Sequence, residues 1–226
     1  MQVLLTRSIE ENRKFKKSID CHGLEFHSIP LIAYQKFELD FDYLKNFDVI
    51  VITSKFAASI LPSTKEQKIK VRVVGSVSAS ILKEKGYCVI QQAKSAKEIK
   101  DEILKKDHNK TILYLRGNYI STSMPDFVLN KIFYKTSYLS KLTNKQIDYI
   151  KQKPEYILLY SKKSAQTLFQ LISNYNLENY IKDSIIIAMS NKIANILSKV
   201  CANVVIKDDN SKIINYLKSA YEQKAN

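Results

Sequence analysis

The chain has 226 residues, of which 45% are hydrophobic and 26% are charged. This composition is typical of a globular protein, and the length suits one large domain or two small ones. The longest apolar runs, such as Ser184–Met189, have only the length of a strand, which argues against a transmembrane helix. The first residues lack the layout of a signal peptide, so we expect a cytoplasmic protein.

The chain is basic, with 36 Lys and Arg residues against 22 Asp and Glu residues and a net charge of +14. Lysine supplies most of this charge. The arginines are Arg7, Arg13, Arg72 and Arg116. Lysines on solvated faces and a field that attracts a polyanion both explain the charge. No RNP, KH, zinc-finger or helix-turn-helix signature accompanies it, so we expect no nucleic-acid partner.

Cysteine and histidine are not spaced for a disulfide framework or a metal site. The dispersed cysteines are Cys21, Cys88 and Cys201, and the histidines are His22, His27 and His108. No CxxC pair occurs, and no two histidines have helix-face ligand spacing with a carboxylate. Glycine-rich nucleotide loops are also absent from the sequence. We therefore expect no disulfide, no metal and no nucleotide.

Strands and helices alternate in the first part of the chain. Asp48–Ile52 is apolar without alternation, which is typical of a parallel strand covered on both faces. Strands are also predicted over Gln2–Thr6, Leu24–Ile29, Val71–Val74, Tyr87–Ile90 and Thr111–Leu115. Capping residues and apolar spacing predict helices over about Ile9–Cys21, Phe41–Asn46, Phe56–Leu61, Ala79–Lys85, Ser95–Lys105 and Met124–Asn130. A turn is expected over Gly75–Ser78, before one of these helices.

The second part repeats this scheme. Strands are predicted over Glu155–Tyr160, Ile185–Met189 and Asn203–Ile206, and helices over Ser164–Ser173, Lys192–Lys199 and Ser211–Gln223. Such alternation predicts an α/β fold with two parallel-sheet domains related as a repeat. No proline- or glycine-rich linker separates them, so we expect two ordered crossings, one after Pro30 and one over Lys131–Leu139. An active-site cleft is expected between the domains.

Ligands of open parallel sheets gather beyond the carboxyl ends of the strands. Small hydroxyls and free amides at helix N-termini can bind carboxylates or phosphates there, although each residue can equally serve only as a helix cap. Arg116 can clamp a carboxylate or form an ion pair within its domain. The candidate substrate-binding residues are Thr6, Arg7, Thr53, Ser54, Lys55, Gly75, Ser76, Ser78, Arg116, Gly117, Asn118, Ser161, Lys162, Ser164 and Ser190.

Two tyrosines differ from the other twelve of the chain's fourteen. Tyr134 and Tyr138 lie on the second crossing, at the edge of the expected cleft. A phenol in this position can donate a proton to a leaving hydroxyl. We therefore name Tyr134 as the candidate catalytic residue, with Tyr138 as the alternative.

The order and spacing of several segments resemble the uroporphyrinogen-III synthase family. The similar segments are VLLTR (Val3–Arg7), IPLI (Ile29–Ile32), VITSKFA (Val51–Ala57), VVGSVSASILKEKG (Val73–Gly86), LYLRGN (Leu113–Asn118), FYKTS (Phe133–Ser137) and ILLYSKKSAQTL (Ile157–Leu168). The resemblance implies a first domain over residues 1–34 and 138–226, a second over 38–132, and linker strands over 35–37 and 133–137.

The resemblance also implies an activity. The family acts as a hydro-lyase on hydroxymethylbilane, a linear tetrapyrrole with eight carboxylates, and closes it with inversion of ring D and loss of water. No cofactor is required, and we expect a monomer. The alternative is a non-catalytic two-lobed binding protein for an anionic ligand or nucleic acid.

Individual residues match the family's pattern unequally. Tyr134 falls where the family has a tyrosine near the leaving hydroxyl. Ser78 replaces the usual threonine of a VGxxTA pattern and keeps its hydroxyl. In AMSNKIA, Ser190 stands for the usual glycine and Ile193 for the usual threonine, so backbone amides are expected to make the substrate contacts there.

Overall fold

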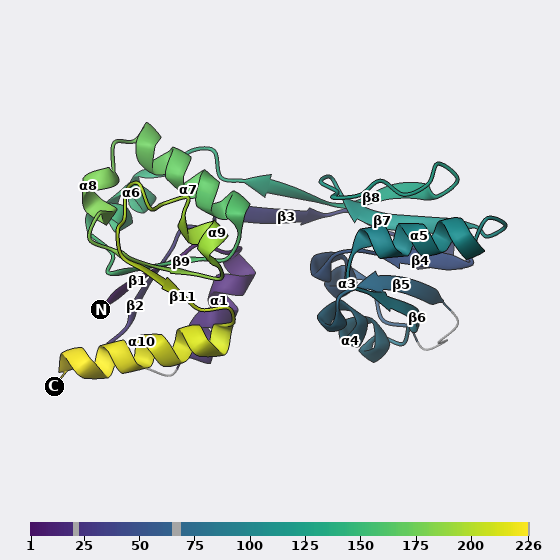
Figure 1. The fold of residues 1–226 in the computed structure, drawn as a ribbon, viewed down its shortest axis with the longest axis horizontal. Helices are drawn as coiled ribbons and strands as arrows, with labels where there is room; N and C mark the ends of the chain where they lie inside the picture. The colour runs from purple at the N-terminus through teal and green to yellow at the C-terminus, as the bar shows by residue number, and fades with distance from the viewer. Residues whose placement is uncertain (20–22, 65–68, 226) are drawn as a thin grey trace. The chain divides into compact units, whose positions relative to one another are not determined.

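The chain divides into two compact units in a computed structural model that describes residues 1–19, 23–64 and 69–225. Unit 1 combines both ends of the chain, Met1–Ala33 and Ser137–Asn226, and unit 2 is Tyr34–Thr136 (Figure 1). The predicted α/β fold with two sheets of mainly parallel strands is confirmed.

The sheet of unit 1 has five strands in the order β11-β10-β9-β1-β2, and all of its pairings are parallel. The strands are β1 (Gln2–Leu5), β2 (Glu25–Ser28), β9 (Tyr156–Leu159), β10 (Ile185–Ala188) and β11 (Val204–Ile206). The central strand β9 is buried along its whole length, as expected for a parallel strand covered on both faces. Strands β2 and β11 are the two edges.

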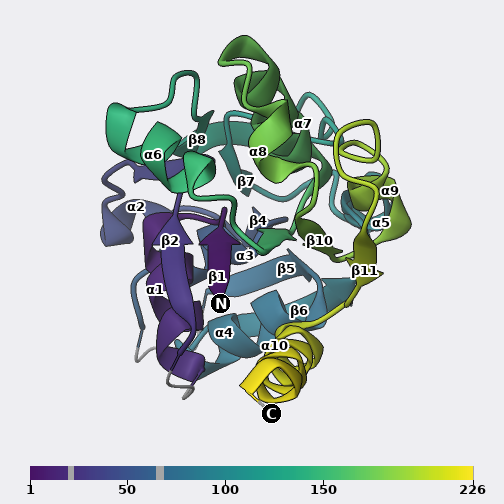
Figure 2. The same ribbon diagram turned by 90° about the vertical axis from the view of Figure 1, so that its left-hand side faces the viewer.

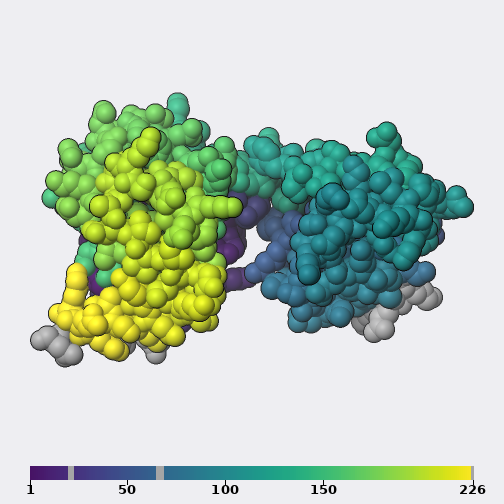
Figure 3. Space-filling view, viewed as in Figure 1, coloured from purple at the N-terminus to yellow at the C-terminus, as the bar shows by residue number. Residues whose placement is uncertain are grey.

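Helices cover both faces of this sheet. They are α1 (Ile9–Ser18), α6 (Asn144–Lys151), α7 (Lys162–Asn174), α8 (Glu178–Ile181), α9 (Asn191–Ala194) and α10 (Asn210–Ala225). On one face, Leu5 shares a buried cluster with Phe15 of α1 and Leu217 of α10. On the other face, Leu4 shares a cluster with Ile150 of α6. Helix α10, coloured yellow, lies on the outside of the unit (Figures 1 and 3).

The sheet of unit 2 has the strand order β3-β8-β7-β4-β5-β6. Its strands are β3 (Ile32–Lys36), β4 (Val49–Ile52), β5 (Lys70–Val74), β6 (Cys88–Ala93), β7 (Ile112–Gly117) and β8 (Leu129–Tyr138), and its helices are α2 (Phe41–Leu44), α3 (Lys55–Ile60), α4 (Ser76–Glu84) and α5 (Ala96–Lys106). Ile52 shares a buried cluster with Ala57 of α3 and Leu82 of α4. Val51 points to the other face and packs with Ile99 of α5.

Strands β3 and β8 are neighbours and form the connection between the units. The backbone N–H of Phe37 donates to the carbonyl of Phe133 at 2.9 Å, and that of Leu139 donates to the carbonyl of Leu31 at 3.0 Å. The chain therefore crosses between the units on two hydrogen-bonded strands. No helix within the described residues is long and apolar enough to span a membrane.

Five predicted elements differ from the structure by three residues or more. Strand β6 runs to Ala93 instead of ending at Ile90. The helix expected over Met124–Asn130 does not form, because β8 begins at Leu129 and pairs in parallel with β7 from that residue. Helix α4 begins at Ser76, three residues before the predicted start. Helix α9 ends at Ala194 instead of Lys199, because backbone bonds between residues three apart follow it.

The fifth difference concerns the end of α1. The helix ends at Ser18, and Ile19 is already extended. The predicted end, Cys21, lies outside the described residues, as does His22.

Candidate functional site

Tyr134 meets Ser54 at the carboxyl ends of the strands of unit 2. The Tyr134 hydroxyl donates to Ser54 Oγ at 2.9 Å, and the tyrosine is only 8% exposed. Ser54 is also the N-cap of α3, where its Oγ accepts from the backbone N–H of Ala57 at 3.0 Å. The serine is therefore held by the start of a helix and in turn orients the phenol.

Gly117 allows the tyrosine ring to lie against β7. A Cβ on Gly117 would lie 2.7 Å from the ring of Tyr134, well inside van der Waals contact. The two residues are partners in the β7–β8 ladder, at a register shift that follows Arg116. Gly117 thus leaves the space that the Tyr134 ring occupies, and the backbone there has no positive φ.

Two further aromatic rings hold Tyr134. The ring of Phe56 lies 5.0 Å from that of Tyr134 in an edge contact, and the ring of Tyr34 lies 6.3 Å away. Tyr34 and Phe56 stack on each other at 4.2 Å. Offset and edge contacts of this kind favour one ring orientation, so the phenol has a fixed direction.

A second phenol lies beside the first. Tyr114 is buried, and its hydroxyl shares a hydrogen bond of 2.7 Å with Thr53 Oγ1. Burial raises the pKa of Tyr114, because the charged phenolate loses its solvation, and the bond from Thr53 only partly offsets this effect. Tyr114 therefore keeps its proton, and Thr53 is engaged with the core of the unit.

The side chains of Arg116, near the end of β7, and Asn118, just after it, have different hydrogen-bond partners. The side chain of Asn118 accepts from the Thr136 N–H at 2.7 Å and donates to the Thr136 carbonyl at 3.1 Å, so it fastens β8. Arg116 donates to the Gly117 carbonyl at 3.0 Å, and its buried Nε has no hydrogen-bond partner among the described residues. No carboxylate of a described residue forms an ion pair with Arg116.

The residues after β5 are positioned by Gly75. Its φ of +84° is a conformation that L side chains rarely adopt. Ser76 is exposed at the start of α4, as is Lys55 at the start of α3. Ser78, by contrast, is only 4% exposed, because it lies on the inner side of α4.

Exposed apolar side chains accompany these residues and were missed by the sequence analysis. Val77 on α4 is 54% exposed, and Tyr119 and Ile120, which follow β7, are 66% and 40% exposed. All three lie just beyond the carboxyl ends of strands. Hydrophobic residues in such positions give no signal in a sequence, because their exposure depends on how the helix and loop are turned.

The predicted residues of unit 1 are mostly engaged with its framework. Thr6 is 1% exposed and donates to the Leu158 carbonyl. Ser161 caps α7 by accepting from the Ser164 N–H at 3.1 Å, and the two hydroxyls are 2.8 Å apart. Lys162 is exposed on the first turn of α7. Ser190 precedes α9 without a side-chain cap bond.

Arg7 lies against a tyrosine that the sequence analysis did not select. The Arg7 guanidinium is 4.5 Å from the ring centre of Tyr160 and also pairs with Glu11. The buried Tyr160 hydroxyl has no hydrogen-bond partner among the described residues. Burial raises the pKa of Tyr160, which therefore stays neutral. A buried hydroxyl without a partner is uncommon.

The two candidate acids lie in different units. Tyr134 belongs to unit 2 and Tyr138 to unit 1, where the Lys163 ammonium lies 5.7 Å from the centre of the Tyr138 ring. Ile193 is 7% exposed in the core of unit 1. Over the described residues, no group of three His, Cys, Asp or Glu side chains could hold a metal ion.

The chain is similar to known proteins in both sequence and fold. A family model described as "Uroporphyrinogen-III synthase HemD" matches residues 13–210. The uncharacterized protein RP474 of Rickettsia prowazekii is 30% identical, over 92% of this chain and 94% of that protein. Among solved structures, the fold is similar to uroporphyrinogen-III synthetase from Helicobacter pylori, with a TM-score of 0.60 and 16% identity over 97% of this chain and 98% of that one.

A mutant uroporphyrinogen III synthase from Thermus thermophilus is also similar, with a TM-score of 0.55 and 13% identity over 99% of both chains. At these identities the two structures establish the fold alone. The family match covers most of the chain and agrees with that fold. This chain therefore belongs to the uroporphyrinogen-III synthase family.

Proposed function

We propose that the protein is a uroporphyrinogen-III synthase, a hydro-lyase that converts hydroxymethylbilane to uroporphyrinogen III. Family membership supports this activity. The observation that links this activity to particular residues is the contact of Tyr134 with Ser54 and Gly117 at the ends of β4 and β7. A phenol held in one direction at this edge is suited to transfer a proton to a bound ligand.

The proposed substrate is an octacarboxylate, and the chain has the charge to attract it. The net charge of +14 raises the local concentration of a polyanion. Arg116 has no carboxylate partner among the described residues and is the proposed clamp for one substrate carboxylate. Exposed Lys55 and Ser76 are further proposed contacts. No cofactor takes part in this proposal.

Tyr134 is the proposed general acid. Its proton passes to the hydroxymethyl oxygen of the substrate as the carbon–oxygen bond breaks, so that the hydroxyl leaves as water. The cation at the former hydroxymethyl carbon is then attacked by the ring D carbon that already carries the chain, which gives a spiro intermediate. The older bond from that carbon to the neighbouring methylene breaks, and the methylene cation so released is attacked by the free α-carbon of ring D, so that the macrocycle closes with this ring inverted. The proton released when the product's pyrrole ring reforms returns to the phenolate, which balances the reaction. Before the first step, the O–H bond of Tyr134 must rotate about the C–O bond from Ser54 toward the substrate, while the ring keeps its position.

Val77, Tyr119 and Ile120 are proposed to contact the pyrrole rings. These side chains are exposed beside the strand ends, and flat apolar rings bind to such surfaces by burying area. The polar residues would then hold carboxylates while the apolar ones hold the ring system. We also propose a cytoplasmic monomer, since the substrate is small.

A product assay tests the function directly. The protein is supplied with freshly generated hydroxymethylbilane, the products are oxidised, and uroporphyrin isomers I and III are separated by chromatography. Spontaneous closure gives isomer I, so a protein-dependent rise in isomer III supports the synthase. If only isomer I forms, and the circular-dichroism spectrum shows that the protein is folded, the proposed synthase activity is wrong. Binding of the bilane without turnover would then favour a non-catalytic binding protein.

A further inference from the structure

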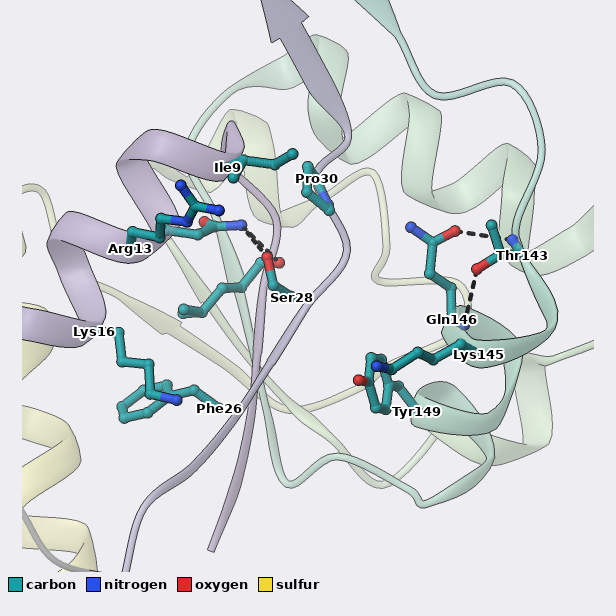
Figure 4. Close-up of a pocket in the computed structure, with 12 residues that line it drawn as sticks. Ile9, Arg13, Lys16, Phe26, Ser28, Pro30, Thr143, Lys145, Gln146 and Tyr149 are labelled. Atoms are coloured by element: carbon teal, nitrogen blue, oxygen red, sulfur yellow. Dashed lines mark hydrogen bonds between the residues drawn. The ribbon is translucent and has the colours of Figure 1, made fainter.

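Strand β2 is an edge of the unit 1 sheet (Figure 2). A groove of about 450 Å³ runs along its open edge (Figure 4). Its walls are α1 and α6, which lie on opposite faces of the sheet. Ser28 Oγ accepts from Asn12 Nδ2 of α1 at 2.7 Å, and the ring of His27 stacks at 4.4 Å on Tyr149 of α6. None of the proposed substrate contacts lines this groove.

The floor of the groove is formed by the backbone of β2 on the side that has no partner strand among the described residues. The N–H groups of Glu25 and Ile29 donate at 2.9 Å to the carbonyls of Met1 and Leu5, on the side of β2 that faces β1. Alternate residues of a strand point their hydrogen-bonding groups to opposite sides, and β2 has no neighbour beyond β1 among the described strands. The N–H and C=O groups of Phe26 and Ser28 therefore face the groove, and both residues line it.

The walls of the groove carry positive charge. Arg13 and Lys16 project from α1, and Lys145 projects from α6 (Figure 4). All three are exposed, and none forms an ion pair with a carboxylate of the described residues. Between them lie apolar side chains, including Ile9 and Phe26. The groove thus offers backbone donors and acceptors, apolar surface and three cations.

We propose that this groove binds an extended acidic segment of a partner protein, which adds as a strand to β2. Strand addition uses the free N–H and C=O groups for affinity and the side-chain surface for specificity. The cations at the walls, which form no ion pair with a carboxylate of the described residues, select acidic side chains by charge complementarity. Pro30, which lines the groove and has no N–H, limits the paired stretch at one end.

Two other occupants fit less well. A second copy of this chain would bring its own Arg13, Lys16 and Lys145 to the same place, and like charges oppose such pairing. A nucleic acid would satisfy the cations, but phosphate oxygens only accept hydrogen bonds and leave the outward carbonyls of Phe26 and Ser28 unpaired. A peptide supplies both donors and acceptors.

The first test is peptide binding to the full chain. A fluorescein-labelled octapeptide of alternating Glu and Val residues is titrated with protein, and binding is followed by fluorescence polarisation. We expect saturable binding that weakens at least tenfold in an Arg13→Glu/Lys16→Glu variant. The matched control is Lys14→Glu/Lys17→Glu, which makes the same charge change on the same helix at exposed residues outside the groove. Equal loss in both variants contradicts a specific groove.

The second test separates strand addition from simple charge attraction. The same peptide with N-methylated backbone amides keeps its carboxylates and cannot form the ladder, so we expect its binding to be lost. In amide hydrogen exchange, the peptide should slow exchange at Phe26 and Ser28, while Glu25 and Ile29, already bonded to β1, serve as internal references. Equal binding of the methylated peptide, or unchanged exchange at Phe26 and Ser28, overturns the proposal.

Discussion

Gly117 and Tyr134 are so close that glycine is required at this point of β7. A Cβ on Gly117 would meet the tyrosine ring at 2.7 Å from its Cζ and 2.8 Å from its hydroxyl. Gly117→Ala must therefore displace the phenol and lengthen its bond to Ser54. We expect isomer III formation to fall by about tenfold to a hundredfold, because small misplacements of a reacting group have effects of this size. The measurement is the initial rate of isomer III formation.

A control for this prediction comes from another glycine of unit 2. Gly86 has a φ of +87°, and a Cβ there would lie 1.9 Å from the Thr64 carbonyl oxygen. Gly86→Ala should therefore lower the free energy of unfolding while the folded fraction keeps its rate. If Gly117→Ala retains the full rate with an unchanged spectrum, the position of the Tyr134 ring does not matter for activity.

Removal of the Tyr134 hydroxyl tests the proposed acid. Tyr134→Phe keeps the ring against Phe56 and Gly117 and deletes only the donor to Ser54. General acids contribute about 10²–10⁴-fold to rates, and we expect a loss near the lower end, because the bilane closes without an enzyme. Tyr138→Phe is the matched control and should retain the rate. The opposite result for the two variants would transfer the role to Tyr138.

The strand ends and their helix caps could be predicted from the sequence because they depend on local rules. Ser54 and Ser161 each follow an apolar strand and cap the next helix, as small hydroxyl residues in that position do. The approach of Tyr134 to Gly117 could not be predicted, because it depends on a register shift between two strands far apart in the chain. The exposure of a hydroxyl could not be predicted either. Ser78 is buried because α4 begins at Ser76, which places Ser78 on the inner side of the helix.

The buried pair of Arg72 and Asp107 makes the stability of unit 2 sensitive to acid. Arg72 Nη2 lies 2.5 Å from Asp107 Oδ2, and Lys110 lies 2.6 Å from Oδ1. Burial alone would raise the pKa of Asp107, but the Lys110 bond and the Arg72 charge outweigh it, so the pKa lies below its usual 3.8. A carboxyl with a lowered folded-state pKa stabilises the fold above its unfolded pKa. This contribution is lost as the pH falls through the folded-state value.

Asp107→Asn should therefore cost about 3–5 kcal/mol at neutral pH, the usual effect of breaking a buried pair. Urea unfolding at a series of pH values measures it. The variant should also lose less stability than the wild type between about pH 4 and strong acid, since it lacks this titrating group. Asp101→Asn, at an exposed pair with Lys97, is the control and should change little. A variant with the wild-type pH profile would show that Asp107 does not carry the effect.

Cys201 and Cys88 should react with thiol reagents at very different rates. Cys201 is fully buried, its Sγ donates to the Ile181 carbonyl at 2.8 Å, and burial raises its pKa to about 11. Cys88 is exposed on edge strand β6. In a Cys21→Ser background, an aromatic disulfide reagent at mildly alkaline pH should modify one thiol rapidly, and Cys88→Ser should abolish this phase. Because the thiolate is the reacting species, Cys201 should react only as unit 1 opens, and urea should accelerate it. Rapid modification of Cys201 in native protein would mean that the packing around α8 and α9 opens readily.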